Sequence, residues 1–175
     1  MINLRKTLTI SSACLQAQGI EHALIGGFAL AAHGINRATA DIDFLADGKK
    51  KNIIIESLTK SGFKLVHQTD DVLQFQGVGN LDIILANRPL SQKMLSLAQD
   101  SEKLSTRVVM PEDIIGLKIQ AYKNEPTREL QDKADIQALI LAHNSSMDWK
   151  RIKEYADLFN EWEVIKKLGG NSDIR

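Results

Sequence analysis

The sequence predicts an α+β fold, in which helices flank a mixed β-sheet and a helical subdomain follows. Strand-like runs at 63–68, 72–77 and 81–86 are separated by turn residues, which indicates antiparallel hairpins. A short helical segment separates two earlier strand-like runs, 22–25 and 41–45, and this spacing indicates a crossover connection. Helical patterns dominate the last third. We therefore expect a sheet core over 1–110 and a helical subdomain over 111–175.

The helices and strands follow from local signals in chain order. Gly19, Gly34 and Gly62 end the first three expected helices, and strands are marked by short apolar or alternating runs. The helix expected at 49–61 should direct Ile53, Ile54, Ile55 and Leu58 toward the core. Besides the strands above, the expected elements are helices at 2–18, 28–33, 49–61 and 89–98, a short strand at 107–109, and helices at 111–123, 127–142, 148–158 and 160–168.

Composition excludes several classes of protein. Lys plus Arg (22) balance Asp plus Glu (22), so the basic excess of a general nucleic-acid coat or membrane-surface protein is missing. The single cysteine, Cys14, cannot form an intrachain disulfide or a thiolate cluster. No secretory leader pattern opens the sequence and no apolar run has the length of a membrane span. These features predict a cytoplasmic protein without a membrane partner.

Three aspartates suggest a metal site. Asp41 and Asp43 are two residues apart in a strand and should project from one face, and Asp82 interrupts another apolar strand. Carboxylates gathered about 4 Å apart would repel one another by about 4 kcal/mol per pair at an effective dielectric near 20. Hard divalent cations bind oxygen ligands and remove that repulsion. Taken alone, however, an Asp-x-Asp pair is more often a solvated strand end.

A glycine pair precedes these aspartates. Leu24-Ile25 ends a strand at Gly26-Gly27, and a helix follows at once. The missing side chains let a phosphate approach backbone N–H groups. The junction lacks the lysine of a P-loop and the spacing of a dinucleotide-binding fingerprint, so by itself it is weak evidence.

Together, Gly26-Gly27, the following Asp41-Ile42-Asp43 and the later Asp82 resemble the motif of the nucleotidyltransferase (polymerase-beta-like) superfamily. The longer string from Ile25 to Leu45 is similar to a bacterial branch that includes abortive-infection-type toxins, and to small antibiotic nucleotidyltransferases. The resemblance spans about residues 20–142. It implies a metal-dependent enzyme that transfers a nucleoside monophosphate from a nucleoside triphosphate such as ATP to a hydroxyl, releasing pyrophosphate.

The resemblance also implies individual roles. Asp41, Asp43 and Asp82 match the family's ligands for two Mg²⁺ ions (Mn²⁺ being an alternative), and Asp82 matches the carboxylate that activates the acceptor hydroxyl. The residues that would bind the nucleotide are Gly26, Gly27, Arg37, Thr39, Lys118 and Asp132.

Local alternatives remain for three of these residues. Lys118 shares a helix face with isoleucines, where a lysine either extends to water or meets an anion. Asp132 is spaced with Arg128 and Asp135 as in a helical ion-pair ladder. Arg37 could contact phosphate or pin its loop to a carboxylate.

The acceptor is open at this stage: a small hydroxylated molecule, an RNA end or a protein side chain, with a cognate antitoxin as a further partner. The neutral net charge argues mildly against a long RNA footprint. The competing hypothesis is a catalytically silent nucleotide-binding or interaction protein on the same fold, and a third is a helical oligomerisation protein.

Overall fold

A computed structural model of the chain describes residues 3–169. Their contacts form two compact units, one made of residues 3–32 and 36–109 and the other of residues 33–35 and 110–169. The first unit contains the sheet and the second contains helices only. The fold is α+β with a mixed sheet, as predicted. Among the described residues, no helix is both long and apolar enough to cross a membrane.

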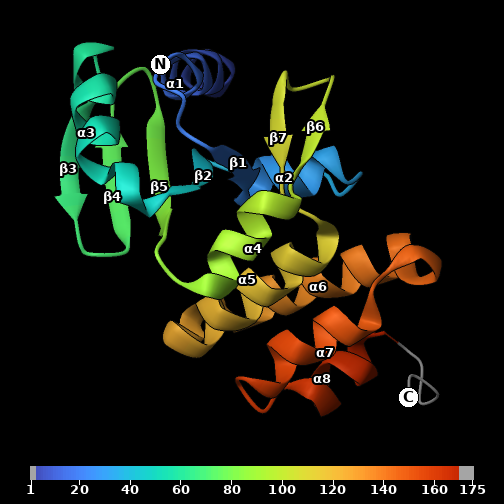
Figure 1. The fold of residues 1–175 in the computed structure, drawn as a ribbon. Coiled ribbons are helices and arrows are strands. Elements are labelled where there is room, and N and C mark those ends of the chain that lie inside the picture. The colour runs from blue at the N-terminus through green and yellow to red at the C-terminus, as the bar shows by residue number, and fades with distance from the viewer. Residues whose placement is uncertain (1–2, 170–175) are drawn as a thin grey trace. The chain divides into compact units, whose positions relative to one another are not determined.

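The sheet of the first unit has seven strands in the order β3-β4-β5-β2-β1-β7-β6 (Figure 1). Pairing is antiparallel for β3–β4, β4–β5, β1–β2 and β6–β7, and parallel for β2–β5 and β1–β7. The strands are β1 (His22–Ile25), β2 (Asp41–Asp47), β3 (Lys64–Gln68), β4 (Val72–Gln76), β5 (Asn80–Ala86), β6 (Gln99–Ser101) and β7 (Thr106–Val108).

Side chains alternate across the central strands. In β2, Ile42 and Phe44 are fully buried, whereas Asp41 and Asp43, which alternate with them, are partly exposed. In β5, Leu81 and Ile83 are buried on either side of the partly exposed Asp82. One face of these strands therefore contributes to the apolar core, and the three aspartates lie on the other.

Helices of this unit are α1 (Leu4–Ala17), α2 (Gly26–Ala32), α3 (Lys51–Lys60) and α4 (Pro89–Leu97), with a 3-10 turn η1 (Gly48–Lys50) before α3. Helix α1 contacts α3 and strands β1, β2 and β5, and contributes the buried Leu8 and Leu15 to the core. Asn3 caps α1 by accepting a hydrogen bond from the backbone N–H of Lys6, which satisfies one of the free donors of the first turn.

The second unit consists of α5 (Pro111–Asn124), α6 (Glu129–His143), α7 (Trp149–Asp157) and α8 (Trp162–Leu168), with 3-10 turns η2 (Pro126–Arg128) and η3 (Asn144–Ser146). Helix α5 packs on α6 and α7, and α8 packs on α6 and α7. Asp113 of α5 accepts hydrogen bonds from Arg151 and Tyr155 of α7, a buried polar contact that joins the two helices.

Two predictions of detail are wrong, and one strand was missed. The strands 22–25 and 41–45 pair antiparallel, not through a crossover; the connecting residues are long enough for either arrangement, so their number could not decide. Ile53 is 38% exposed, because the inward face of α3 is set by the i, i+4 pair Ile54 and Leu58. Strand β6 was not expected, since Gln99-Asp100-Ser101 has little β propensity.

Candidate active site

The three predicted aspartates converge. One carboxylate oxygen from each of Asp41, Asp43 and Asp82 lies within 4.8 Å of those of the other two. The cause is the parallel pairing of β2 and β5, whose register places Asp43 directly opposite Asp82. At this separation, unit charges repel by about 3 to 4 kcal/mol per pair at an effective dielectric near 20.

Neutral side chains hold two of the three carboxylates. The Thr39 hydroxyl donates a hydrogen bond to Oδ1 of Asp41 at 2.9 Å, and Nε2 of Gln74 donates to Oδ2 of Asp82 at 3.0 Å. Partial burial raises the pKa of the Asp82 carboxyl, and the Asp41 charge adds to this rise, whereas the Gln74 hydrogen bond opposes it. Asp82 is thus a better proton acceptor than an ordinary surface aspartate.

The glycine pair lies directly against this cluster. Helix α2 begins at Gly26, two residues earlier than predicted, and Gly26 has a positive φ of 63°. A Cβ at Gly26 would lie 2.0 Å from Oδ2 of Asp43, and a Cβ at Gly27 would lie 2.6 Å from Cβ of Thr39. Any side chain at either position would displace the residues that shape the site. Close packing therefore requires both glycines, and backbone conformation requires Gly26 as well.

The donor set fits a divalent cation. Three carboxylates offer hard oxygen ligands from two strands of a rigid sheet, and each aspartate alternates with buried neighbours that fix its backbone. The missing side chain of Gly26 leaves room for the Asp43 carboxylate in the cluster. A cation among these oxygens would remove most of their mutual repulsion.

The other predicted nucleotide-binding residues are distributed over both units. Arg37 is in the loop between α2 and β2, where its Nη1 donates to the carbonyl of Ala38 at 3.0 Å. Lys118 and Asp132 belong to the helical unit, in α5 and α6. The Lys118 ammonium lies 2.8 Å from Oδ1 of Asp132 and 2.6 Å from Oδ2 of Asp135.

The Lys118 cluster resolves the alternatives that the sequence left open for that lysine. Lys118, Asp132 and Asp135 are all at least 95% buried, so the lysine meets anions and does not extend to water. Arg128 and Asp132 form the expected i, i+4 contact at 3.3 Å, whereas Asp135 pairs with Lys118 on the neighbouring helix. The spacing along α6 predicted the first contact, but not the second.

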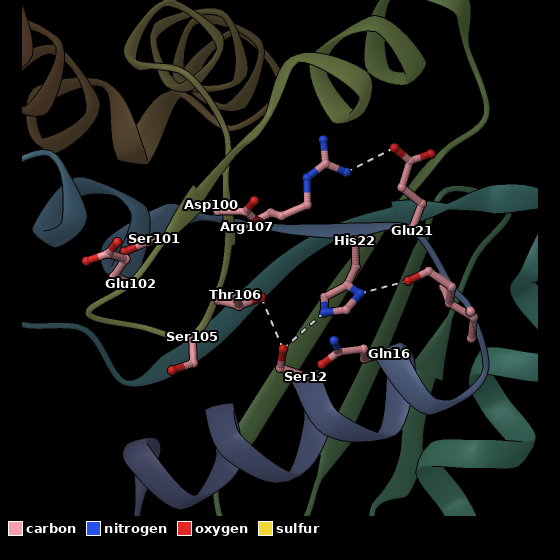
Figure 2. Close-up of a pocket in the computed structure, with 12 residues that line it drawn as sticks. Ser12, Gln16, Glu21, His22, Asp100, Ser101, Glu102, Ser105, Thr106 and Arg107 are labelled. Atoms are coloured by element: carbon pink, nitrogen blue, oxygen red, sulfur yellow. Dashed lines mark hydrogen bonds and ion pairs between the residues drawn. The ribbon is translucent and has the colours of Figure 1, made fainter.

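A separate cavity of about 560 Å³ lies at the other end of β1 (Figure 2). His22 begins β1, whereas Ile25 at its far end is opposite Asp43, which separates this cavity from the triad. On its floor, His22 Nδ1 donates to the Ile20 carbonyl at 2.8 Å, and Ser12 Oγ lies 3.1 Å from His22 Nε2 and 3.0 Å from Thr106 Oγ1. Burial lowers the pKa of His22, which favours the neutral ring. These contacts tie α1 to β1 and β7.

Comparison with known proteins identifies the family and the fold. Residues 11–166 match the model of the family described as nucleotidyl transferase AbiEii toxin, type IV toxin–antitoxin system. The chain belongs to the AbiEii nucleotidyltransferase toxin family. Membership establishes the general activity class, nucleotidyl transfer, and the link with toxin–antitoxin systems. A comparison with curated protein sequences gives no match.

Solved structures share the fold at low sequence identity. The antibiotic-resistance factor ANT(2'')-Ia is similar with a TM-score of 0.64 and 15% identity, over 93% of this chain and 95% of that one. A nucleotidyltransferase-like protein from Paracoccidioides brasiliensis has a TM-score of 0.58 and 20% identity, over 95% and 91% of the two chains. The lincosamide adenylyltransferase LnuA has a TM-score of 0.52 and 17% identity, over 63% and 82%.

Proposed function

We propose that this AbiEii-family protein transfers a nucleoside monophosphate from a nucleoside triphosphate to a hydroxyl group, with divalent cations held by Asp41, Asp43 and Asp82. The single observation that carries the proposal is the convergence of three carboxylate oxygens within 4.8 Å beside Gly26. We propose Mg²⁺ as the natural cation, bound as two ions, with Mn²⁺ able to replace it. Bound there, the ions would neutralise the triphosphate and polarise its α-phosphate.

The reaction requires one proton transfer and one displacement at phosphorus. The acceptor oxygen forms a bond to the α-phosphorus while the bond from that phosphorus to the bridging oxygen breaks, and pyrophosphate leaves. The proton of the acceptor hydroxyl passes to the Asp82 carboxylate, whose raised pKa suits it to receive a proton. In-line positioning supplies much of the rate gain, without a covalent protein intermediate.

The proposed nucleotide contacts extend beyond the triad. Gly26 and Gly27 would let the triphosphate approach the backbone, because neither carries a side chain next to Asp43 and Thr39. Arg37, Thr39, Lys118 and Asp132 stay proposed contacts. A triphosphate that reached Lys118 would compete with Asp132 and Asp135, which already bind its ammonium.

The partners follow from the family in general terms. The toxin–antitoxin assignment supports a cognate antitoxin as a binding partner. For the acceptor, we keep a small hydroxylated molecule, an RNA end and a protein side chain as the three classes. Labelled nucleotide separates them because each class leaves the label in a different fraction.

The direct test is incubation with each labelled triphosphate, Mg²⁺ and cell extract, followed by identification of the labelled product. Wild type should transfer label, and Asp41→Asn combined with Asp43→Asn should lose more than about 100-fold, since even partners that only orient metal ligands are worth about 10- to 100-fold. Asp47→Asn, at the other end of β2, is the matched control. If wild type binds no triphosphate and transfers no label, the protein is a silent member of the fold.

A further inference from the structure

Gln74 lies beside the triad without belonging to it. It is on β4, and the antiparallel register of β4 and β5 places it directly opposite Asp82. Its Nε2 donates a hydrogen bond to Oδ2 of Asp82 at 3.0 Å, and both side chains are partly buried. Asp43, Asp82 and Gln74 therefore form one row across β2, β5 and β4.

This hydrogen bond restricts the carboxylate. An aspartate carboxyl rotates about χ2 with only a broad, roughly two-fold preference, so its two oxygens are not fixed by the strand. A donor fixed on the neighbouring strand holds Oδ2 and sets the plane of the group. Gln74 then determines how the remaining lone pairs of Asp82 point into the space that it shares with Asp41 and Asp43.

The chemistry of the donor matters as much as its position. An ammonium or guanidinium in place of the amide would neutralise Asp82 and compete with a metal ion, whereas an amide donates without adding positive charge. Asp41 has a comparable neutral donor, because the Thr39 hydroxyl donates a hydrogen bond to one oxygen of that carboxylate. Neutral donors thus hold two of the three aspartates while their negative charge is preserved.

We propose that Gln74 is a positioning residue of the active site, which orients the Asp82 carboxylate for metal binding and for proton acceptance from the acceptor hydroxyl. The inference rests on the proposed function, because it assigns a role relative to the triad. The competing explanation is a cross-strand pair that contributes only to sheet stability. If Gln74 only stabilises the sheet, a side chain of the same shape without a donor preserves metal binding and transfer. If Gln74 positions Asp82, such a side chain does not.

Gln74→Met separates these explanations because methionine keeps the length and volume of the side chain but removes the donor. Gln76→Met is the matched control: Gln76 is two residues along β4 on the same face, opposite Asn80 rather than an aspartate. Binding of Mn²⁺ is measured by electron paramagnetic resonance with a non-hydrolysable ATP analogue, and label transfer is measured at saturating Mn²⁺ and ATP. Thermal unfolding shows that each variant is folded.

Gln74→Met should weaken Mn²⁺ binding and lower the saturated transfer rate by about tenfold each, as expected for the loss of a partner that orients a metal ligand. Gln76→Met should change neither quantity. Gln74→Leu, which also lacks a donor, replaces the methionine variant if that variant does not fold. If Gln74→Met binds Mn²⁺ and transfers label like Gln76→Met, Gln74 has no positioning role and the proposed function stands. If wild type itself shows neither binding nor transfer, the proposed function fails, and the role of Gln74 fails with it.

Discussion

The two units each contain a cluster of carboxylates, and the clusters differ in how their charge is handled. In the helical unit, Asp132 and Asp135 are buried around Lys118, which lies within 2.8 Å of an oxygen of each. In the sheet unit, Asp41, Asp43 and Asp82 are only partly buried, and the hydrogen-bond donors to Asp41 and Asp82 are a hydroxyl and an amide.

The difference indicates what each cluster is for. Complete burial of carboxylates requires a cation of the protein itself, because an unpaired buried charge is very costly. Partial exposure would let the triad exchange a bound cation or substrate with solvent, while uncharged donors hold the oxygens of Asp41 and Asp82. Lys118 compensates the buried charge of Asp132 and Asp135, and we attribute to the triad the capacity to bind metal ions.

The largest expected effect is on the stability of the helical cluster. Lys118→Met would leave Asp132 and Asp135 buried without their ammonium, and removing one partner of a buried ion pair costs about 3 to 5 kcal/mol. Denaturant unfolding should show this loss. Lys60→Met, which removes the exposed partner of Glu56, is the control and should leave the unfolding curve unchanged. An unchanged curve for Lys118→Met would remove the distinction between the clusters.

Next in size is the effect of a side chain on the first glycine. Gly26→Ala combines a positive φ with a Cβ placed 2.0 Å from Oδ2 of Asp43, so transfer should fall by more than about 100-fold as that ligand is displaced. Gly19→Ala has the same backbone conformation, with φ of 60°, but open space around its Cβ. It should cost about 1 to 2 kcal/mol of stability with normal specific activity. Equal activities of the two variants would show that Asp43 does not need its present position.

A smaller effect is expected on stability when the triad loses one charge, and its sign is opposite to that expected for the Lys118 cluster. The pKa of Asp82 is raised in the folded state above its ordinary value, so the carboxylate form destabilises the metal-free protein progressively as pH rises above about 4. At pH 7 with a chelator, Asp82→Asn should therefore be more stable than wild type. Added Mg²⁺ should raise the midpoint of wild-type unfolding more than that of the variant. A destabilised variant in chelator would mean that Asp82 contributes to the fold as an ordinary hydrogen-bond acceptor.

The smallest expected effect is the pH dependence of stability that arises from His22, whose buried ring is kept neutral. Its folded-state pKa is lowered, chiefly by burial, so the unfolded chain binds a proton more readily and stability falls as pH drops below about 6.5. The slope for one proton cannot exceed about 1.4 kcal/mol per pH unit. Unfolding between pH 7 and 5.5 should show it, and His22→Gln should flatten it. A slope that persists in His22→Gln would assign the titration to another group.

Much of the site was readable from the sequence because it depends on local spacing. The alternation of β2 determines which side of the strand Asp41 and Asp43 occupy, and the glycine pair marks the end of β1. Each of these sequence signals lies within a few residues of the feature that it predicts. These predictions therefore did not require knowledge of the tertiary packing.

The contacts that were missed join residues that are distant in sequence. They depend on strand register or helix packing, which a single sequence does not reveal. Gln74 meets Asp82 only because β4 pairs with β5 in one alignment, although the polar positions 74 and 76 in an otherwise apolar strand were a visible hint. Asp135 meets Lys118 because α5 packs on α6. The direction of β2 relative to β1 is likewise a tertiary outcome.

The most direct test of the metal-binding claim is anomalous X-ray diffraction from crystals soaked with Mn²⁺ and a non-hydrolysable ATP analogue. The account predicts anomalous peaks about 2.1 Å from carboxylate oxygens of Asp41, Asp43 and Asp82, a typical distance for small octahedral cations. Bound nucleotide with no peak at these carboxylates, or Mn²⁺ held only at other residues, would contradict it.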